Sequence, residues 1–262
     1  MTALQRVTGL DRTIDPRLPS NLFALLASLA AGVIVAVQRG SILEIVAGAG
    51  WVFASWALGR ELDPDRPLTA ALTSSAALIA LLGVGEAHKL AFPALSATGL
   101  LMIAARAGLN STGRALQIGD EIVIATAPLI AQLLTGLPLG ILGISSLTAL
   151  YVRRGAWWSM ALALVGIAGA FLAPTRDGGV VLVAVALLAL GGLSLLRSVP
   201  KSQNDHGGSY DLQGWRVMQA GIWAGAAIAA LLAPPLIWGS LAVTGVLAMI
   251  LERLKPLTPF SP

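Results

Sequence analysis

The chain has 262 residues, of which 56% are hydrophobic and only 11% are charged, and its net charge is +4. Soluble domains carry about 25% charged residues, so this composition excludes an ordinary soluble protein and predicts a polytopic membrane protein. The chain has no cysteine and only two histidines, His88 and His206. It therefore cannot form disulfides, use a thiolate for catalysis or build a histidine-rich metal cluster.

Ten apolar runs follow a polar leader at residues 1–20. In chain order they occupy residues 21–37, 41–59, 68–85, 90–105, 121–135, 137–152, 156–173, 179–196, 215–233 and 236–251. A bilayer core of about 30 Å requires about 20 helical residues, so the fourth, fifth and sixth runs are short. Runs 121–135 and 137–152 could instead form a re-entrant hairpin, which would leave eight spans.

This pattern predicts an all-α fold, a helix bundle integral to a membrane. We expect a cytoplasmic leader at residues 1–20, a single transmembrane helical domain over residues 21–254 and a cytoplasmic tail at 255–262. The longest connection contains SQNDHGGSY, and its composition predicts a flexible inner loop near residues 198–213.

Lysine and arginine divide unequally between alternate connections. Of the 17 basic residues, 14 lie in the leader, in every second connection and in the tail, and the intervening connections hold only Arg39, Lys89 and Arg176. The positive-inside rule then places both termini in the cytoplasm and excludes a nucleic-acid-binding role for the surplus charge. Ten spans with both termini inside is similar to the drug/metabolite transporter layout, in span count and topology alone. The predicted location is a bacterial-type inner (plasma) membrane.

The densest cluster of charge is the octet Arg60–Pro67, which lies between the second and third runs. Each proline favours an extended residue before it, and alternate residues of an extended segment point the same way. Glu61, Asp63 and Asp65 could therefore converge on Mg²⁺ or Ca²⁺. The two arginines of the octet compete for the same oxygens, so we favour a turn at the membrane face that pairs its own charges, with no metal or cofactor.

A second polar segment, residues 106–121, lies on the same predicted side. Because the third and fourth spans are joined by a four-residue turn, we expect them to form a hairpin that returns the chain beside the octet. The predicted result is one charged cluster at the cytoplasmic face, made of Arg60, Glu61, Asp63, Asp65, Arg66, Arg106, Asn110, Arg114, Asp120 and Glu121.

Two acids of that segment, Asp120 and Glu121, open the fifth run. Acids at a helix N-terminus are stabilised by the helix dipole, which is a sufficient reason for their position. The alternative is that one of them enters a cavity open to the cytoplasm and pairs with Arg60, Arg106 or Arg114.

Other polar side chains lie within the apolar runs. Glu44 is one turn inside the second run, and we expect its carboxylate to reach back to the interface. Gln132 lies deeper, in the fifth run, and is a candidate at membrane depth. Thr73, Ser74, Ser75 and Thr126 would line a cavity with it, or would only pack helices together. Gly221 and Gly225 form a GxxxG pair, which is typical of close helix contact.

Enzyme signatures are missing from the sequence. It contains no phosphate-binding loop of the Walker type, no HExxH and no GxSxG. The leading hypothesis is a transporter or permease whose partners are the lipid bilayer and a small solute. The second is a membrane-embedded enzyme acting on a lipid or phosphorylated head group at the cytoplasmic face, and the third is a non-catalytic scaffold.

Overall fold

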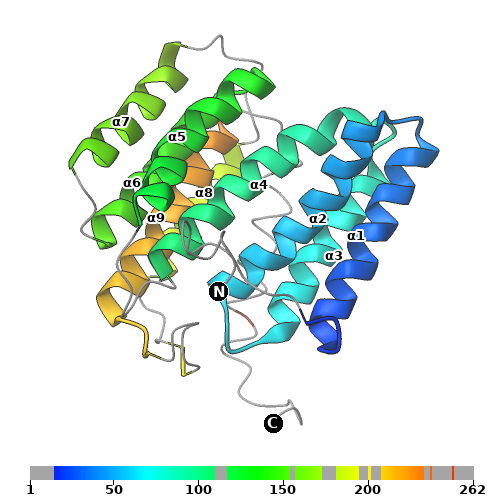
Figure 1. Ribbon diagram of the computed structural model, residues 1–262, viewed down its shortest axis with the longest axis horizontal. Coiled ribbons are helices and arrows are strands. Elements are labelled where there is room, and N and C mark those ends of the chain that lie inside the picture. Colours follow the sequence, from blue (N-terminus) through cyan, green and yellow to red (C-terminus); the bar gives the residue numbers. More distant parts are fainter. Residues whose placement is uncertain are drawn as a thin grey trace.

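The structure is a computed structural model that describes residues 15–109, 117–153, 157–172, 181–194, 200–201, 208–232, 237 and 250. In this part of the chain the only regular secondary structure is helix, with no strand (Figure 1). The helices are α1 (Pro19–Val37), α2 (Ile42–Leu62), α3 (Pro67–Gly83), α4 (Ala87–Leu109), α5 (Ile118–Thr135), the 3-10 helix η2 (Leu139–Leu142), α6 (Gly143–Val152), α7 (Trp157–Leu172), α8 (Val181–Ser194) and α9 (Leu212–Ala230). Most of the leader, the tail and all but two residues of the predicted tenth span lie outside the described residues.

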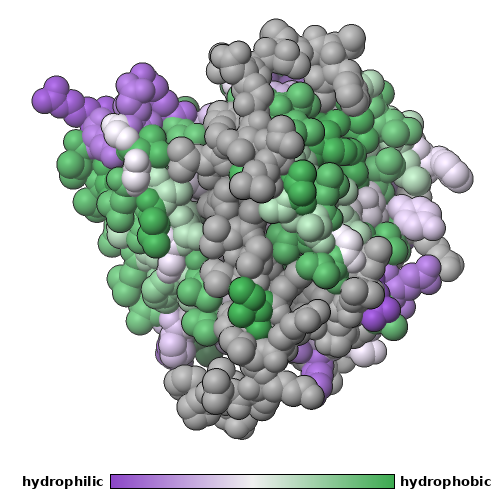
Figure 2. Space-filling view, turned by 180° about the vertical axis from the view of Figure 1, so that it is seen from behind, coloured by the Kyte–Doolittle hydropathy of each residue, from purple (hydrophilic) through white to green (hydrophobic). Residues whose placement is uncertain are grey.

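Four helices, α1, α2, α4 and α5, are long and apolar enough to cross a membrane. Shorter apolar helices are α3, η2 with α6, α7 and α8, whereas α9 has 19 residues but is not among these four. Large apolar side chains lie exposed along α1 and α5, as at Leu29 (67% exposed) and Leu133 (75%). Figure 2 shows hydrophobic side chains over much of the visible described surface, with hydrophilic residues gathered toward its margins. Such a surface is unusual for a soluble monomer, and the architecture is compatible with a membrane helix bundle.

Consecutive helices run in opposite directions. We call the end of the bundle where α2 passes into α3 the junction end, and the opposite end the far end. At the far end Gln38, which follows α1, donates its Nε2 to the carbonyl oxygen of Val84 after α3 (3.2 Å). Its Oε1 accepts the backbone N–H of Ala87, the first residue of α4 (2.8 Å). One side chain therefore holds two far-end connections together.

The helices α3 and α4 do not form the hairpin that was predicted for the third and fourth spans. α3 packs against α1 and α2, because small residues let the backbones approach: a Cβ added at Gly59 would lie 2.8 Å from the Cα of Ala70. α4 packs along α2 instead, and the indole Nε1 of Trp51 donates to Thr98 Oγ1 at 3.1 Å. Its other neighbours are α5, α6 and α9, so α4 lies between the group α1–α3 and the group α5–α9 (Figure 1).

The helices α5 and α6 form an antiparallel hairpin. Both alternatives for the fifth and sixth runs, two full spans or a re-entrant hairpin, require this arrangement. α5 ends at Thr135, and the next residue, Gly136, has a φ of 64°, which is left-handed and therefore suits glycine. The returning arm approaches α7 very closely, because a Cβ at Gly140 would collide with the carbonyl oxygen of Gly166. These glycines let the two backbones meet without intervening side chains.

The GxxxG packing predicted on α9 is confirmed. A Cβ at Gly221 would lie 2.5 Å from Thr148 Oγ1 of α6, and one at Gly225 would collide with Ser145. The hydroxyl of Ser145 also donates to the carbonyl oxygen of Gly221 at 3.0 Å. α9 is thus held against α6 by small residues and one buried hydrogen bond.

Candidate functional site

The octet begins as helix, which corrects the prediction of an extended segment. α2 continues to Leu62, so Arg60 and Glu61 lie in its last turn. Asp63 ends the helix, and Arg66 is extended (φ −128°, ψ 98°) before Pro67, as proline requires. Because Glu61 is helical and Asp63 is the residue that ends α2, the carboxylates do not follow the alternation of a strand.

Glu61 forms a buried ion pair with Arg106. Nη1 of Arg106 donates to Oε1 of Glu61 at 2.8 Å, and the two side chains are 8% and 6% exposed. Arg106 belongs to the last turn of α4, not to a polar connection as predicted. The predicted proximity of the octet to Arg106 is confirmed at this pair, but it arises because α2 and α4 run parallel and end together.

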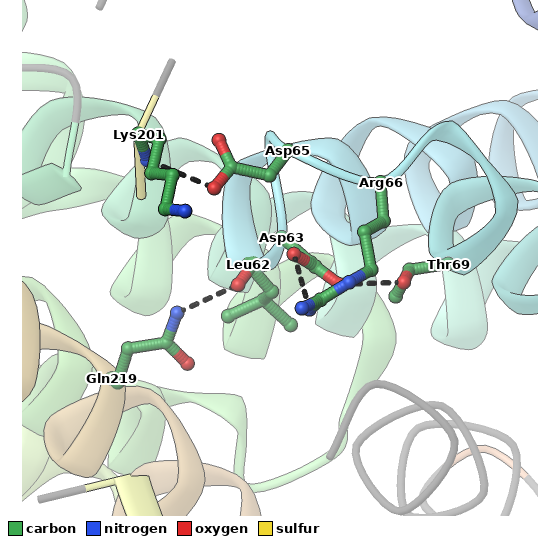
Figure 3. Close-up of polar contacts among 7 residues, drawn as sticks. All are labelled: Leu62, Asp63, Asp65, Arg66, Thr69, Lys201 and Gln219. Carbon is green, nitrogen blue, oxygen red and sulfur yellow. Dashed lines mark hydrogen bonds and ion pairs between the residues drawn. The ribbon is translucent and has the colours of Figure 1, made fainter. Parts of the chain in front are cut away.

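Asp63 and Asp65 have partners of their own (Figure 3). The carboxylate of Asp63 accepts the hydroxyl of Thr69 at 2.7 Å and lies 3.4 Å from Nη1 of Arg66. Asp65 accepts the backbone N–H of Lys201 at 2.8 Å, so the connection between α8 and α9 reaches the octet. The contacts of Asp63 join the end of α2 to the start of α3. The contact of Asp65 joins the octet to the segment before α9.

The acids of the octet do not form a set of metal ligands. In the part of the chain that the structure describes, no group of three or more His, Cys, Asp or Glu is arranged to hold a metal ion. Asp63 pairs with Arg66 inside the octet, as a turn that pairs its own charges would, whereas Glu61 pairs with Arg106 of α4.

α9 contributes a further residue, Gln219. Its side chain is fully buried, and its Nε2 donates to the carbonyl oxygen of Leu62 at 2.9 Å. This bond satisfies a carbonyl at the C-terminus of α2, where no helical partner is available. We call the set Glu61, Leu62, Arg106 and Gln219 the buried junction, because it joins α2, α4 and α9.

No family model, curated protein or solved structure matches this chain. The buried junction is therefore interpreted from its own geometry. It combines one buried charge pair with one buried amide, at the place where the helix groups on the two sides of α4 meet.

Asp120 and Glu121 lie at the start of α5, as the helix-dipole interpretation expected. The Asp120 carboxylate accepts the backbone N–H of Gln117 at 3.1 Å. Glu121 accepts the hydroxyl of Ser159 on α7 at 2.9 Å. Asn110 and Arg114, the remaining predicted members of the cluster, lie outside the described residues.

The two candidates at membrane depth have structural partners. The Glu44 carboxylate accepts both the backbone N–H of Ser41 (2.6 Å) and its hydroxyl (2.7 Å), which caps α2 at the far end. Gln132 accepts the N–H of Gly140 at 2.9 Å and donates to the carbonyl oxygen of Gly169 at 2.7 Å. Gln132 therefore links α5 to η2 and α7.

The hydroxyls proposed as a cavity lining donate along their own helices. Each bonds to a backbone carbonyl oxygen one turn earlier, which is the usual way for serine and threonine to be satisfied within a helix. These residues are Thr73, Ser74, Ser75 and Thr126. Their hydrogen bonds match the packing interpretation.

An exposed ion pair lies at the far end. Nζ of Lys89 lies 2.6 Å from Oε1 of Glu86, and both side chains are about two-thirds exposed. The hydrogen bond from Lys89 lowers the pKa of the Glu86 carboxyl below its usual value. Lys89 belongs to α4, which starts at Ala87, so the predicted four-residue turn is shorter than expected.

Proposed function

We propose that the protein is a multi-pass membrane transporter or permease for a small solute, and that the buried junction is part of its solute pathway. The observation that carries this proposal is the buried ion pair Glu61–Arg106 between two membrane-length helices. The pair lies in the last turn of both helices, and ionisable residues that face the interior of a membrane helix bundle are characteristic of solute and ion pathways. The ion pair joins α2 to α4, and the hydrogen bond from Gln219 joins α9 to α2.

The geometry suits a pathway that opens and closes. A transporter alternates between arrangements of its helix groups, and a few contacts between the groups are made in one arrangement and broken in another. The bond from Gln219 to Leu62 joins α9 to α2, and the bond from Lys201 to Asp65 joins the segment before α9 to the octet. Both are single hydrogen bonds, which a helix movement can exchange.

The orientation in this proposal follows from charge. Of the nine described lysines and arginines, two lie at the far end and seven at the junction end: Arg17, Arg60, Arg66, Arg106, Arg153, Lys201 and Arg216. By the positive-inside rule the junction end is then cytoplasmic. The proposal keeps ten spans with both termini in the cytoplasm, in the cell membrane.

The orientation has a direct test, because the chain has no native cysteine. Single cysteines at Ser209, exposed before α9, and at Gly85, where a side chain meets open space, report opposite ends. In intact cells, a membrane-impermeant maleimide is expected to label Gly85→Cys but to label Ser209→Cys only after permeabilisation. Labelling of both variants from the same side would contradict the proposed orientation.

Transport itself is tested in proteoliposomes. The purified protein is first screened for compounds that raise its unfolding temperature, because a ligand of the native state stabilises it. The panel contains amino acids, sugars, nucleobases, organic cations and phosphorylated metabolites, and each radiolabelled hit is then tested for uptake. We expect protein-dependent uptake of at least one compound. Absence of uptake for the whole panel, with metal-dependent release of lipid head groups, would instead support the enzyme hypothesis.

A further inference from the structure

Three residues of α9 form a buried polar stripe. Trp215, Gln219 and Trp223 are spaced four residues apart, so they lie along one side of the helix. Their side chains are fully buried or 2% exposed. Within the described residues, each has a buried polar atom without a hydrogen-bond partner: the Nε1 donor of each indole and the Oε1 acceptor of Gln219.

Such atoms call for an explanation, because native proteins leave few buried polar groups unsatisfied. Each unsatisfied group costs about 1–3 kcal/mol. The fold can satisfy a buried indole elsewhere, since Trp51 donates to Thr98 at 3.1 Å. Three unsatisfied atoms on one helix face therefore call for polar partners that are not among the described residues.

The orientation of the Gln219 amide is determined by its partner. Its Nε2 lies 2.9 Å from the Leu62 carbonyl oxygen, and a carbonyl oxygen can only accept a hydrogen bond. The nitrogen must therefore face Leu62, and the oxygen is left as an acceptor. Figure 3 shows this oxygen directed away from Leu62.

The stripe lies in the interior, beside the buried junction. Met218, next to Gln219, packs on Gly108 of α4, and Trp223 packs on Gly191 of α8. The edge of the Trp215 ring meets Tyr210, with ring centroids 5.1 Å apart. The stripe carries no formal charge, and of the two buried acids that flank Leu62, Glu61 pairs with Arg106 and Asp63 pairs with Arg66.

We propose that this stripe is the solute-binding surface, and that its ligand is a small uncharged polar solute. Two indole N–H groups require acceptors on the solute, and the Gln219 oxygen requires a donor. A charged solute would lie in a buried site without a counter-charge, which is unfavourable. This inference rests on the proposed transport function, and names the class of solute that the transporter takes.

The test measures equilibrium binding of tritiated uracil, adenine, nicotinamide, glucose and glycerol to the full-length protein in detergent. At least one is expected to bind. Trp215→Phe and Trp223→Phe keep an aromatic ring but remove the N–H, so each is expected to weaken binding about three- to tenfold. The unfolding temperature of the ligand-free variants should stay constant or rise, because each loses an unsatisfied donor.

Trp56→Phe is the matched control. The Trp56 indole is also buried (5% exposed) and has an Nε1 without a partner among the described residues, but it belongs to a separate cluster with Ala24 and Ala70. Its substitution should leave binding unchanged. If no probe binds, or if Trp56→Phe weakens binding as much as the stripe variants, the stripe is not the binding surface.

Uptake in proteoliposomes separates this inference from the proposed function. If the stripe variants lose binding but the parent protein takes up no solute, the stripe stands as a binding site and transport is wrong. If the parent transports a probe and both stripe variants bind and transport it normally, transport stands and the assignment of the stripe is wrong.

Discussion

Replacing Arg106 with methionine is expected to destabilise the protein by about 3–5 kcal/mol, because the substitution leaves Glu61 buried without its counter-charge. The Glu61 side chain is only 6% exposed and lies 2.8 Å from the guanidinium of Arg106. The loss should be visible as lower expression and a lower unfolding temperature in detergent. The double variant Glu61→Leu/Arg106→Met should recover much of the loss, since it removes both charges from the interior.

Lys89→Met provides the control for this prediction. Lys89 pairs with Glu86 at 2.6 Å, and both side chains are about two-thirds exposed. An exposed pair contributes about 0–1 kcal/mol, so this variant should unfold close to the parent. If Arg106→Met is no more destabilising than Lys89→Met, the pair with Glu61 does not behave as a buried one.

The same variants separate stability from function. Glu61→Leu/Arg106→Met removes the ion pair while avoiding a stranded charge. If the pair takes part in transport, as proposed, this double variant should fold but fail to take up the solute. A double variant that folds and transports normally would restrict the ion pair to a structural role.

Gly140→Ala is expected to destabilise the protein by about 1–3 kcal/mol, the usual cost of forcing extra volume into a packed site. Its Cβ would collide with the carbonyl oxygen of Gly166, and would lie 2.5 Å from Oε1 of Gln132. A backbone carbonyl cannot rotate away as a side chain can, so η2 and α7 must separate. The hydrogen bonds of Gln132 to Gly140 and Gly169 would weaken as η2 and α7 separate. Thermal unfolding measures this loss.

Gly99→Ala is the matched control for crowding. Gly99 lies in the middle of α4, and a Cβ there would meet nothing within 4 Å. Alanine should therefore leave stability unchanged or increase it by about 0.5–1 kcal/mol, because it reduces the backbone entropy lost on folding. If the two alanine variants shift the unfolding temperature equally, the close approach of η2 to α7 is not needed for stability.

Contacts of α3 and α4 show where reasoning along the sequence was insufficient. A short connection suggested that they pack together, but α3 packs on α1 and α2, whereas α4 packs on α2 and the later helices. Hydropathy could not predict this choice, because apolar side chains gain little by exchanging lipid for another helix. Small residues such as Gly59 and Ala70 decide which backbones can approach closely.

The candidate site was predictable only in part. Glu61 and Arg106 could be expected to lie near each other from the side assignments, and their contact is observed. The pairing of Glu61 rather than Asp63 depends on α2 continuing to Leu62, beyond the predicted second run, which ended at residue 59. Gln219 carried one signal, its four-residue spacing from Trp215 and Trp223, which reveals a shared helix face but not its partner on α2.

The sequence by itself determined that the chain is helical, that long apolar runs alternate with polar connections, and that basic residues concentrate in every second connection. These properties depend on local composition and on the length that a bilayer imposes. Only the tertiary structure decided that α4 lies between two groups of helices, that Glu61 meets Arg106, and that three polar atoms on α9 are buried without partners among the described residues. Those features depend on which small residues let two backbones approach, and this information is spread over helices far apart in the chain.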